Sequence, residues 1–296
     1  MSDATSDLRD GSVCWVELFP SEFLKRQRAF GVVYLPMGLC EPHGQIAALG
    51  LDSIKAQLLC EAAARAVGGI VAPCTGFHVH ECGPSARWLL ENVGETDAPL
   101  GSVGPWAMAH FLLHQLRSLT NSGFAAAVIV SGHAGAHAGD LSLIVEKFSA
   151  EFNFPCRYIT DAELAKPRFQ PDHAGRYEIS LLQFLRPELV DWNRASLASD
   201  KASGGKLALG SDAAEANAAT GRVIFGYLVE RLSEVAQEIL PAGVPPRRHV
   251  SFCETEGLWT QLRRNSASWA CVKPRPGQAE VPADSRWNEG ECVAHI

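Results

Sequence analysis

Residues 31–44 read GVVYLPMGLCEPHG. The first part, 31–38, is an apolar, β-branched run without polar alternation, and this pattern predicts a strand that is buried on both faces. The second part carries a carboxylate, Glu41, and an imidazole, His43, in a turn-forming context. A buried strand that leads directly into such side chains is typical of α/β proteins, in which sites lie beyond the carboxyl ends of the strands.

The rest of the chain alternates apolar runs with helical patterns. Further strands are expected over 69–75, 124–132 and 156–160. Helices are expected over 53–69, with Asp52 as the N-cap, and over 105–123, 140–152 and 222–240; the segment 177–185 continues the alternation. Strands without polar alternation, separated by helices, predict an α/β protein, with a largely parallel central sheet covered on both faces.

Two regions of different character are expected. Residues 1–240 carry the alternating pattern, whereas residues 241–296 show little periodicity and read as an irregular extension. The extension nevertheless holds Trp259, Trp269 and Trp287, and aromatic residues are what disordered tails lack. We therefore expect residues 241–296 to pack on the domain or on a neighbouring subunit.

Composition excludes several classes of partner. The chain has 296 residues, and 26 Lys and Arg stand against 33 Asp and Glu, for a net charge of −7. An acidic chain without a basic run is not built to bind nucleic acid or an anionic membrane. The nine cysteines form no Cys-x-x-Cys pair, the first residues lack an apolar core, and no apolar run reaches membrane-spanning length. We expect reduced thiols and a cytoplasmic location.

Three clusters of carboxylates and imidazoles follow the predicted strands and turns: Glu41, His43 and Asp52 after 31–38; His133 and His137 after 124–132; and His173 and Glu178 further along. Polar residues placed directly after buried strands are candidates for function. A mixed set of nitrogen and oxygen ligands suits Zn, Mn or Fe, and it can hold two ions if one carboxylate bridges them. Taken alone, Asp52 is better explained as a helix cap, and Glu178 can be explained as a first-turn carboxylate favoured by the helix dipole.

These residues resemble the creatininase (creatinine amidohydrolase) family. The likeness rests on the strand-Pro-x-Gly-x-x-Glu-x-His-Gly…Asp pattern, the strand-Gly-His-x-Gly turn and the His-Ala-Gly-x-x-Glu-x-Ser segment, in that order. The opening 15–18 and the approach 210–221 to the last helix resemble the edges of the family. The resemblance covers residues 15–240 and implies a three-layer α/β/α sandwich, usually a homo-oligomer, with a hexamer as one candidate.

The resemblance also implies roles for single residues. Glu41 and His133 would bind one metal, His43 would bind the other, and Asp52 would bridge both. His173 matches the catalytic histidine of the family, and Glu178 matches the carboxylate five residues further on. One or two divalent transition metals are expected, with Zn favoured over Mn or Fe.

The chain departs from the family pattern at the second metal. Creatininase proper has a metal-binding Glu two residues after the strand-end histidine, where this chain has Gly135. Glu178 is the first candidate to complete the second site and His137 is the next; otherwise the site holds a single ion. Tryptophans that enclose the substrate in creatininase are missing from 157–172, where Phe169 is the candidate replacement. Creatinine is therefore not expected as the substrate.

Other histidines carry weaker signals. His80 matches a family position near the substrate, and it is also explained as a structural loop histidine. His110 and His114 stand four residues apart in a predicted helix, which is a spacing compatible with a metal, but their apolar context favours a packed helix face. His80, Phe169 and His137 are the expected substrate contacts.

The sequence and the resemblance together favour a metal-dependent amidohydrolase. It would cleave a non-peptide amide C–N bond, of the cyclic amide or formamide type, in a small molecule through a metal-activated water. Two alternatives remain open: a peptidase that acts on a modified peptide, and a catalytically degenerate member of the family that serves as a scaffold or binding subunit.

Overall fold

A four-stranded parallel sheet of order β2-β1-β5-β6 lies at the centre of the computed structural model, which describes residues 11–241 and 249–288. The strands are β1 (Val32–Met37), β2 (Ile70–Val71), β5 (Ala126–Ser131) and β6 (Cys156–Thr160). Met37 pairs with Ser131, which pairs with Thr160. The carboxyl ends of β1, β5 and β6 therefore lie level at one edge, and the loops that follow them share that edge.

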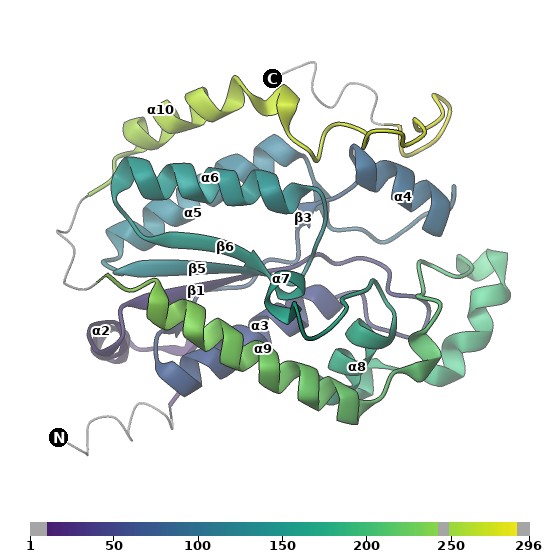
Figure 1. Cartoon of the computed structure of the whole chain (residues 1–296), viewed down its shortest axis with the longest axis horizontal. Coiled ribbons are helices and arrows are strands. Elements are labelled where there is room, and N and C mark those ends of the chain that lie inside the picture. Colours follow the sequence, from purple (N-terminus) through teal and green to yellow (C-terminus); the bar gives the residue numbers. More distant parts are fainter. Residues whose placement is uncertain (1–10, 242–248, 289–296) are drawn as a thin grey trace.

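Helices cover both faces of this sheet (Figure 1). One layer holds α5 (Pro105–Asn121) and α6 (His137–Phe152); the other holds α3 (Leu51–Val67), α8 (Arg176–Leu185) and α9 (Ala218–Glu238). Alternate residues of β1 enter different cores, because successive side chains of a strand point to opposite faces. Val33 joins the core with α5 and α6, and Tyr34 joins the core with α3 and α9. The expected three-layer α/β/α sandwich is confirmed.

The remaining elements surround this sandwich. They are the helices α2 (Pro20–Ala29), α4 (Pro84–Asn92), α7 (Asp161–Ala165) and α10 (Phe252–Arg263), the two-stranded parallel sheet β3 (His78–Val79) with β4 (Ser102–Val103), and the 3-10 helices η1 (Trp15–Glu17), η2 (Pro187–Leu189), η3 (Trp192–Ser199), η4 (Lys201–Ser203), η5 (Ala213–Glu215) and η6 (Ser266–Ser268). In Figure 1, β3 and α4 lie beyond the end of the sheet where the strand arrows finish.

Several local expectations differ from the structure, including the start of α9, which lies four residues before the expected residue 222. The strand expected over 69–75 pairs regularly only at Ile70 and Val71, and the chain then bridges back to β1 at Thr75. The N-cap of α3 is Gly50, so the prediction that Asp52 caps this helix was wrong. The helix starts at Leu51, which places Asp52 inside its first turn. Similarly, α6 starts at His137, three residues earlier than expected.

The C-terminal segment is helical in part. Ser251 and Glu254 form a capping box that begins α10, and this signal is present in the sequence. Trp259 and Trp269 enter the core shared with α5, and Trp287 is buried beside α4, where its Nε1–H donates to the Gly94 carbonyl at 2.7 Å. Throughout residues 249–288 the buried aromatic rings therefore pack on this same chain.

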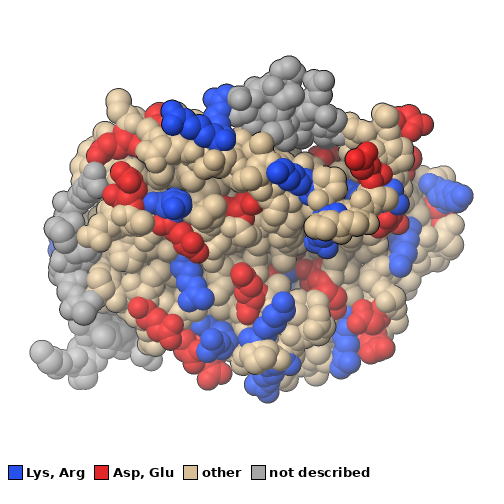
Figure 2. Space-filling model, turned by 45° about the horizontal axis from the view of Figure 1, so that its top comes forward, with Lys and Arg blue, Asp and Glu red and all other residues tan. Residues whose placement is uncertain are grey.

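Charged side chains of both signs are interspersed over the face drawn in Figure 2. Among the residues that the structure describes, no helix is both long enough and apolar enough to cross a membrane. The first residues, whose lack of an apolar core argues against a secretory signal, lie outside the described residues as far as residue 10.

Candidate metal centre

Glu41 and His43 lie in the loop that leaves β1, and both side chains are buried. The Glu41 N–H donates to the Leu49 carbonyl at 3.0 Å, which fixes this loop against the start of α3. His43 Nδ1 lies 3.0 Å from the Glu41 carbonyl oxygen, so Nδ1–H donates there and the lone pair is left on Nε2. That Nε2 is buried without a hydrogen-bond partner among the described residues. An imidazole held by its other nitrogen in this way is prepared to bind a metal.

Asp52 is carried to the same place by the first turn of α3. Two glycines allow the close approach, because a Cβ at Gly132 would lie 2.1 Å from the Asp52 carbonyl oxygen and one at Gly38 would lie 2.3 Å from the Ser53 nitrogen. Asp52 Oδ1 lies 3.5 Å from His43 Nε2, and Oδ2 lies 3.3 Å from Nδ1 of His133. The carboxylate therefore stands between two imidazoles that come from different strand ends.

His133 follows β5 directly and completes this group. Its Nδ1 lies 2.9 Å from Glu41 Oε1 as well as 3.3 Å from Asp52 Oδ2. Its Nε2 is buried, and no described atom forms a hydrogen bond with it. Glu41, Asp52 and His133 thus present two carboxylates and an imidazole to one another, as the sequence predicted from their positions after β1 and β5.

The charges on Glu41, Asp52, His43 and His133 favour the binding of a cation. Burial alone would raise the pKa of Glu41, but the neighbouring histidines, led by His133, lower it to about 2. Burial would also raise the pKa of Asp52, yet Lys55 and the two histidines hold it well below its usual range. Conversely, burial would lower the pKa of His43 and His133, and the surrounding carboxylates raise these values to about 9 and about 10. Without a metal, the carboxylates therefore draw protons onto the two imidazoles.

Lys55 is a charged residue of the centre that the sequence reasoning missed. It lies one turn after Asp52 on α3, and its ammonium is buried. Nζ forms an ion pair with Glu178 and lies 3.3 Å from Asp161 Oδ2 and 3.5 Å from Asp52 Oδ1. Burial would lower the pKa of Lys55, but the carboxylates raise it well above its usual value. A lysine one turn after a candidate ligand, on a helix that is otherwise largely apolar, was the available signal.

His173 and Glu178 are brought to the same edge by the turn that begins α8. His173 Nε2 lies 3.1 Å from the Pro42 carbonyl, so Nε2–H donates there and Nδ1, 4.0 Å from Glu41 Oε1, keeps its lone pair. Its ring stacks on His43, with centroids 4.7 Å apart. Glu178 Oε2 accepts from the Ala174 N–H at 2.8 Å and lies 3.5 Å from His43 Nε2. Both residues predicted as catalytic therefore contact the group around Glu41 and His43.

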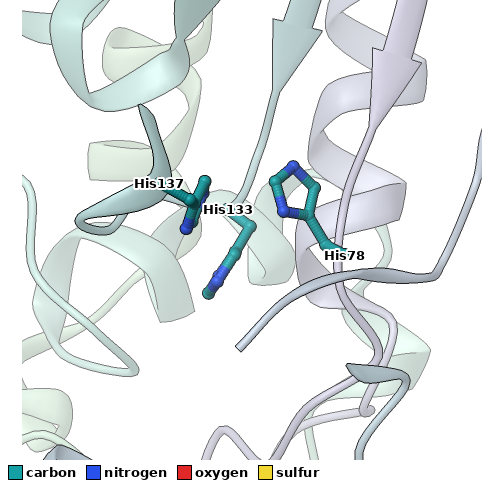
Figure 3. A group of neighbouring side chains, drawn as sticks. All are labelled: His78, His133 and His137. Carbon is teal, nitrogen blue, oxygen red and sulfur yellow. The ribbon is translucent and has the colours of Figure 1, made fainter. Parts of the chain in front are cut away.

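His78, His133 and His137 form a buried imidazole cluster, which shares His133 with the group of Glu41 and Asp52 (Figure 3). The rings of His133 and His137 stack at 4.8 Å, and His78 lies 4.5 Å from His137. The Val79 N–H donates to His78 Nδ1 at 2.9 Å, which places the proton of His78 on Nε2. Burial lowers the pKa of His78 to about 3 and that of His137 well below its usual value, so both rings are neutral.

His137 occupies the space next to Gly135. A Cβ at Gly135 would lie 3.0 Å from His137 Cε1, so a side chain at position 135 would press on this ring. His137 Nε2 is a further buried nitrogen that lacks a hydrogen-bond partner in the described part of the chain. Both candidates to complete a second metal site, Glu178 and His137, are therefore close to the centre, on different sides of it.

The helix α4 contributes an aromatic ring to the surroundings of the centre, and the sequence did not predict this contribution. The Trp88 ring of α4 meets His173 edge-on at 4.7 Å and His80 at 5.8 Å. His80 also lies 3.6 Å from Glu41 Oε2, and burial lowers its pKa to about 4. Phe169, expected near the substrate, instead packs on Tyr227 of α9 at 5.5 Å.

A cavity of about 240 Å³ adjoins the centre at His80. It is lined by residues 80–82 and 102–106, including the ring of Trp106. A space of this size beside neutral imidazoles suits a small molecule. The centre thus combines buried ligands, a histidine with a free ring nitrogen, and an adjoining cavity.

The donor set fits a divalent transition metal. Three groupings within the centre place their ligand atoms within 4.8 Å of one another: Glu41, His80 and His133; Glu41, His43 and His173; and His43, Asp52 and Glu178. Imidazole nitrogen and carboxylate oxygen are the ligands that Zn²⁺ takes in catalytic sites. The buried nitrogen left without a partner at His43, Nε2, is an atom that such an ion would satisfy.

Comparison with known proteins identifies one family. A model of the creatininase family, described as creatinine amidohydrolase, matches residues 17–236. A crystal structure of creatinine amidohydrolase (creatininase) is similar over 79% of this chain and 100% of its own, with 20% identity and a TM-score of 0.63. The manganese form (21% identity, TM-score 0.63) and a mutant of the Zn-Zn type (20% identity, TM-score 0.64) each match over 80% of this chain and 100% of their own. No curated protein was found to match.

Proposed function

Because the chain belongs to the creatininase family, whose model spans residues 17–236, we propose that it is a metal-dependent hydrolase of a non-peptide amide C–N bond in a small molecule. Cyclic amides and formamides are the substrate classes we favour. Zn²⁺ is the metal we favour, with Mn or Fe as alternatives, since similar structures include a Zn-Zn type and a manganese form.

The observation that carries the proposal is the position of Asp52 between two imidazoles. Its two oxygens lie 3.5 Å from His43 Nε2 and 3.3 Å from His133 Nδ1. A buried carboxylate that faces two ligand nitrogens supports a metal-bridging role, and Glu41 Oε1 beside His133 supports a first ion on that side. A divalent ion held by these residues would lower the pKa of a bound water to near neutrality and polarise the amide carbonyl.

His173 is the residue that we assign to proton transfer. Its Nε2–H is engaged with the Pro42 carbonyl, so Nδ1 faces the centre as an acceptor. We propose that Nδ1 accepts a proton from the attacking water and returns it to the leaving nitrogen. Glu178 supports this step by holding the backbone next to His173. Its carboxylate accepts from the N–H of Ala174, the residue after His173, which has a φ of 50° and is fixed in a left-handed conformation.

The two metal positions are unequal in this chain. On the Glu41 side, Asp52 and His133 add two ligands, whereas on the His43 side Glu178 is already ion-paired with Lys55. A buried ammonium beside Glu178 supplies positive charge that a second ion would otherwise provide. We therefore propose one tightly bound ion at Glu41, Asp52 and His133, and a weaker second position at His43.

The cavity next to His80 supports a substrate smaller than a peptide. Val103 and Trp106 supply apolar walls, the neutral His80 supplies hydrogen-bonding nitrogens, and the Trp88 ring packs edge-on against His80. Creatinine is not the substrate we favour, because Phe169 lies with Tyr227 and does not replace the family's enclosing tryptophans. We further propose a cytoplasmic homo-oligomer, with neither nucleic acid nor membrane as a partner.

Metal analysis combined with turnover tests the proposal. Purified protein should contain at least one equivalent of transition metal at the centre, and Glu41→Gln should lose that central equivalent. The metal-loaded protein should hydrolyse members of a panel of cyclic amides and formamides and leave blocked dipeptides intact. Dipeptide turnover alone would favour a peptidase, and a folded protein with neither metal nor turnover would identify a scaffold member of the family.

A further inference from the structure

A second group of metal-ligating side chains lies on the surface, between α5 and α10. His110 Nε2 and His114 Nε2 each lie 2.9 Å from the same atom, Glu256 Oε1. The side chains of His110 and His114 are 37% and 28% exposed, so this helix face packs on α10 and still leaves part of both imidazoles accessible. The group is separate from the metal centre, and Glu256 lies beyond residue 236, where the family match ends.

Neighbouring aromatic rings hold both imidazoles in place. His110 stacks on the buried Trp259 with centroids 4.9 Å apart and planes at 18°. His114 lies 5.9 Å from the ring of Phe252, over which the Arg117 guanidinium carbon stands at 3.7 Å. Side chains that are already fixed lose less conformational entropy when they bind a ligand. The three ligand atoms are therefore arranged before any ion arrives.

We propose that His110, His114 and Glu256 bind a divalent transition metal, with Zn²⁺ as the best match. Two histidines four residues apart on a helix, joined by a glutamate from another helix, make the His₂Glu set that Zn²⁺ takes with a water as the fourth ligand. Ligand atoms about 2.0 Å from a tetrahedral ion lie about 3.3 Å from one another. The two 2.9 Å separations are close to that value, so a small outward rotation of the side chains admits the ion.

The consequence of this site would be structural. α5 belongs to the central sandwich, and α10 belongs to the C-terminal segment, which is otherwise attached by contacts such as the Asn121 side chain with the Val250 backbone at 2.9 Å. An ion shared between the two helices would fasten the C-terminal segment to the domain. Because the ion would bind the folded state in preference to the unfolded chain, it would stabilise the protein by an amount that rises with the logarithm of the free ion concentration above its dissociation constant.

Equilibrium dialysis with Zn²⁺ tests the proposal on the full chain with its metal centre loaded. Wild-type protein should bind one more equivalent than His114→Ala, and Glu256→Gln should weaken that equivalent by at least about tenfold. Added Zn²⁺ should also raise the melting temperature of wild-type protein above that of either variant. The matched control is His249→Ala, which removes an exposed histidine outside the group and should keep the equivalent.

Two further measurements separate this site from the metal centre. Glu41→Gln should lose the central ion and keep the surface equivalent, so the outcome does not depend on the proposed hydrolase activity. The central metal content of His114→Ala and Glu256→Gln should match wild type, which shows that these variants are folded. Equal Zn²⁺ binding by wild-type protein and both surface variants would overturn the proposal and leave Glu256 as a hydrogen-bonded carboxylate only.

Discussion

Lys55 and Glu178 form a buried ion pair at the base of the metal centre, although they come from different helices, α3 and α8. The same ammonium lies 3.3 Å from Asp161, whose carboxylate accepts from the Tyr177 hydroxyl at 3.0 Å. Burial raises the pKa of Asp161 to about 6 against the opposing effect of Lys55. One positive charge is therefore shared among carboxylates that would otherwise repel one another.

Replacing Lys55 with Met should destabilise the metal-free protein by about 3–5 kcal/mol, because removal of one partner leaves uncompensated buried carboxylates. Urea unfolding in the presence of a chelator measures this loss. Lys147→Met, on the exposed side of α6, is the control and should change stability by less than about 0.5 kcal/mol.

The same Lys55→Met variant should bind the second metal ion more tightly than wild type. Loss of the ammonium frees Glu178 Oε1 and leaves the His43 side of the centre with excess negative charge. At the metal centre, apart from the proposed surface equivalent, zinc titration should therefore give two tight equivalents where wild type gives one tight and one weak equivalent. An unchanged titration would show that Lys55 does not compete with the second ion.

Replacing Glu41 with Gln or His133 with Ala should remove the tightly bound ion, because each change deletes one of its ligands. Turnover should then fall at least about a hundredfold, because the ion activates the attacking water. Elemental analysis and the hydrolysis assay measure the two effects together. His78→Gln is the matched comparison: His78 is buried beside His133, but its Nδ1 is engaged by the Val79 N–H. It should keep the metal.

The sequence predicted the layers of the fold and the polar residues at the strand ends because both follow from local patterns. The apolar runs became β1, β5 and β6, and their level carboxyl ends bring together Glu41 and His133, which are far apart in the chain. Register in a parallel sheet is enough to make that contact. The position of His173 at the same edge of the sheet was predicted from the family resemblance.

Other parts of the centre depend on contacts that no local pattern encodes. Trp88 reaches His173 only because α4 lies beyond the sheet, and Phe169 turns toward Tyr227 because its segment packs on α9. The buried position of Lys55 required three carboxylates from three elements. The close approach of the first turn of α3 to both strand ends depends on Gly38 and Gly132, which have no Cβ in the way.

Replacing His173 with Ala should lower kcat by about 10²–10⁴ while the metal content stays at the wild-type value, because His173 is assigned to proton transfer and not to metal binding. Steady-state kinetics with parallel elemental analysis measure both quantities. His173→Gln should not restore the rate, since an amide cannot exchange a proton in this way. Loss of the metal in His173→Ala would instead make His173 a ligand, as its 4.0 Å distance to Glu41 Oε1 would allow.

The metal-free protein should lose stability as the pH rises from neutral to about 10. The pKa values of His43 and His133 are raised from 6.5 to about 9 and about 10, so their protonated forms stabilise the fold fully below pH 6.5. That contribution disappears as the pH passes through the folded-state values. The metal displaces the same protons, so its affinity should increase over this window, and metal-loaded protein should show a flatter profile. Chemical unfolding between pH 6 and 10, with and without chelator, measures the difference; identical profiles would mean that the metal does not bind at these imidazoles.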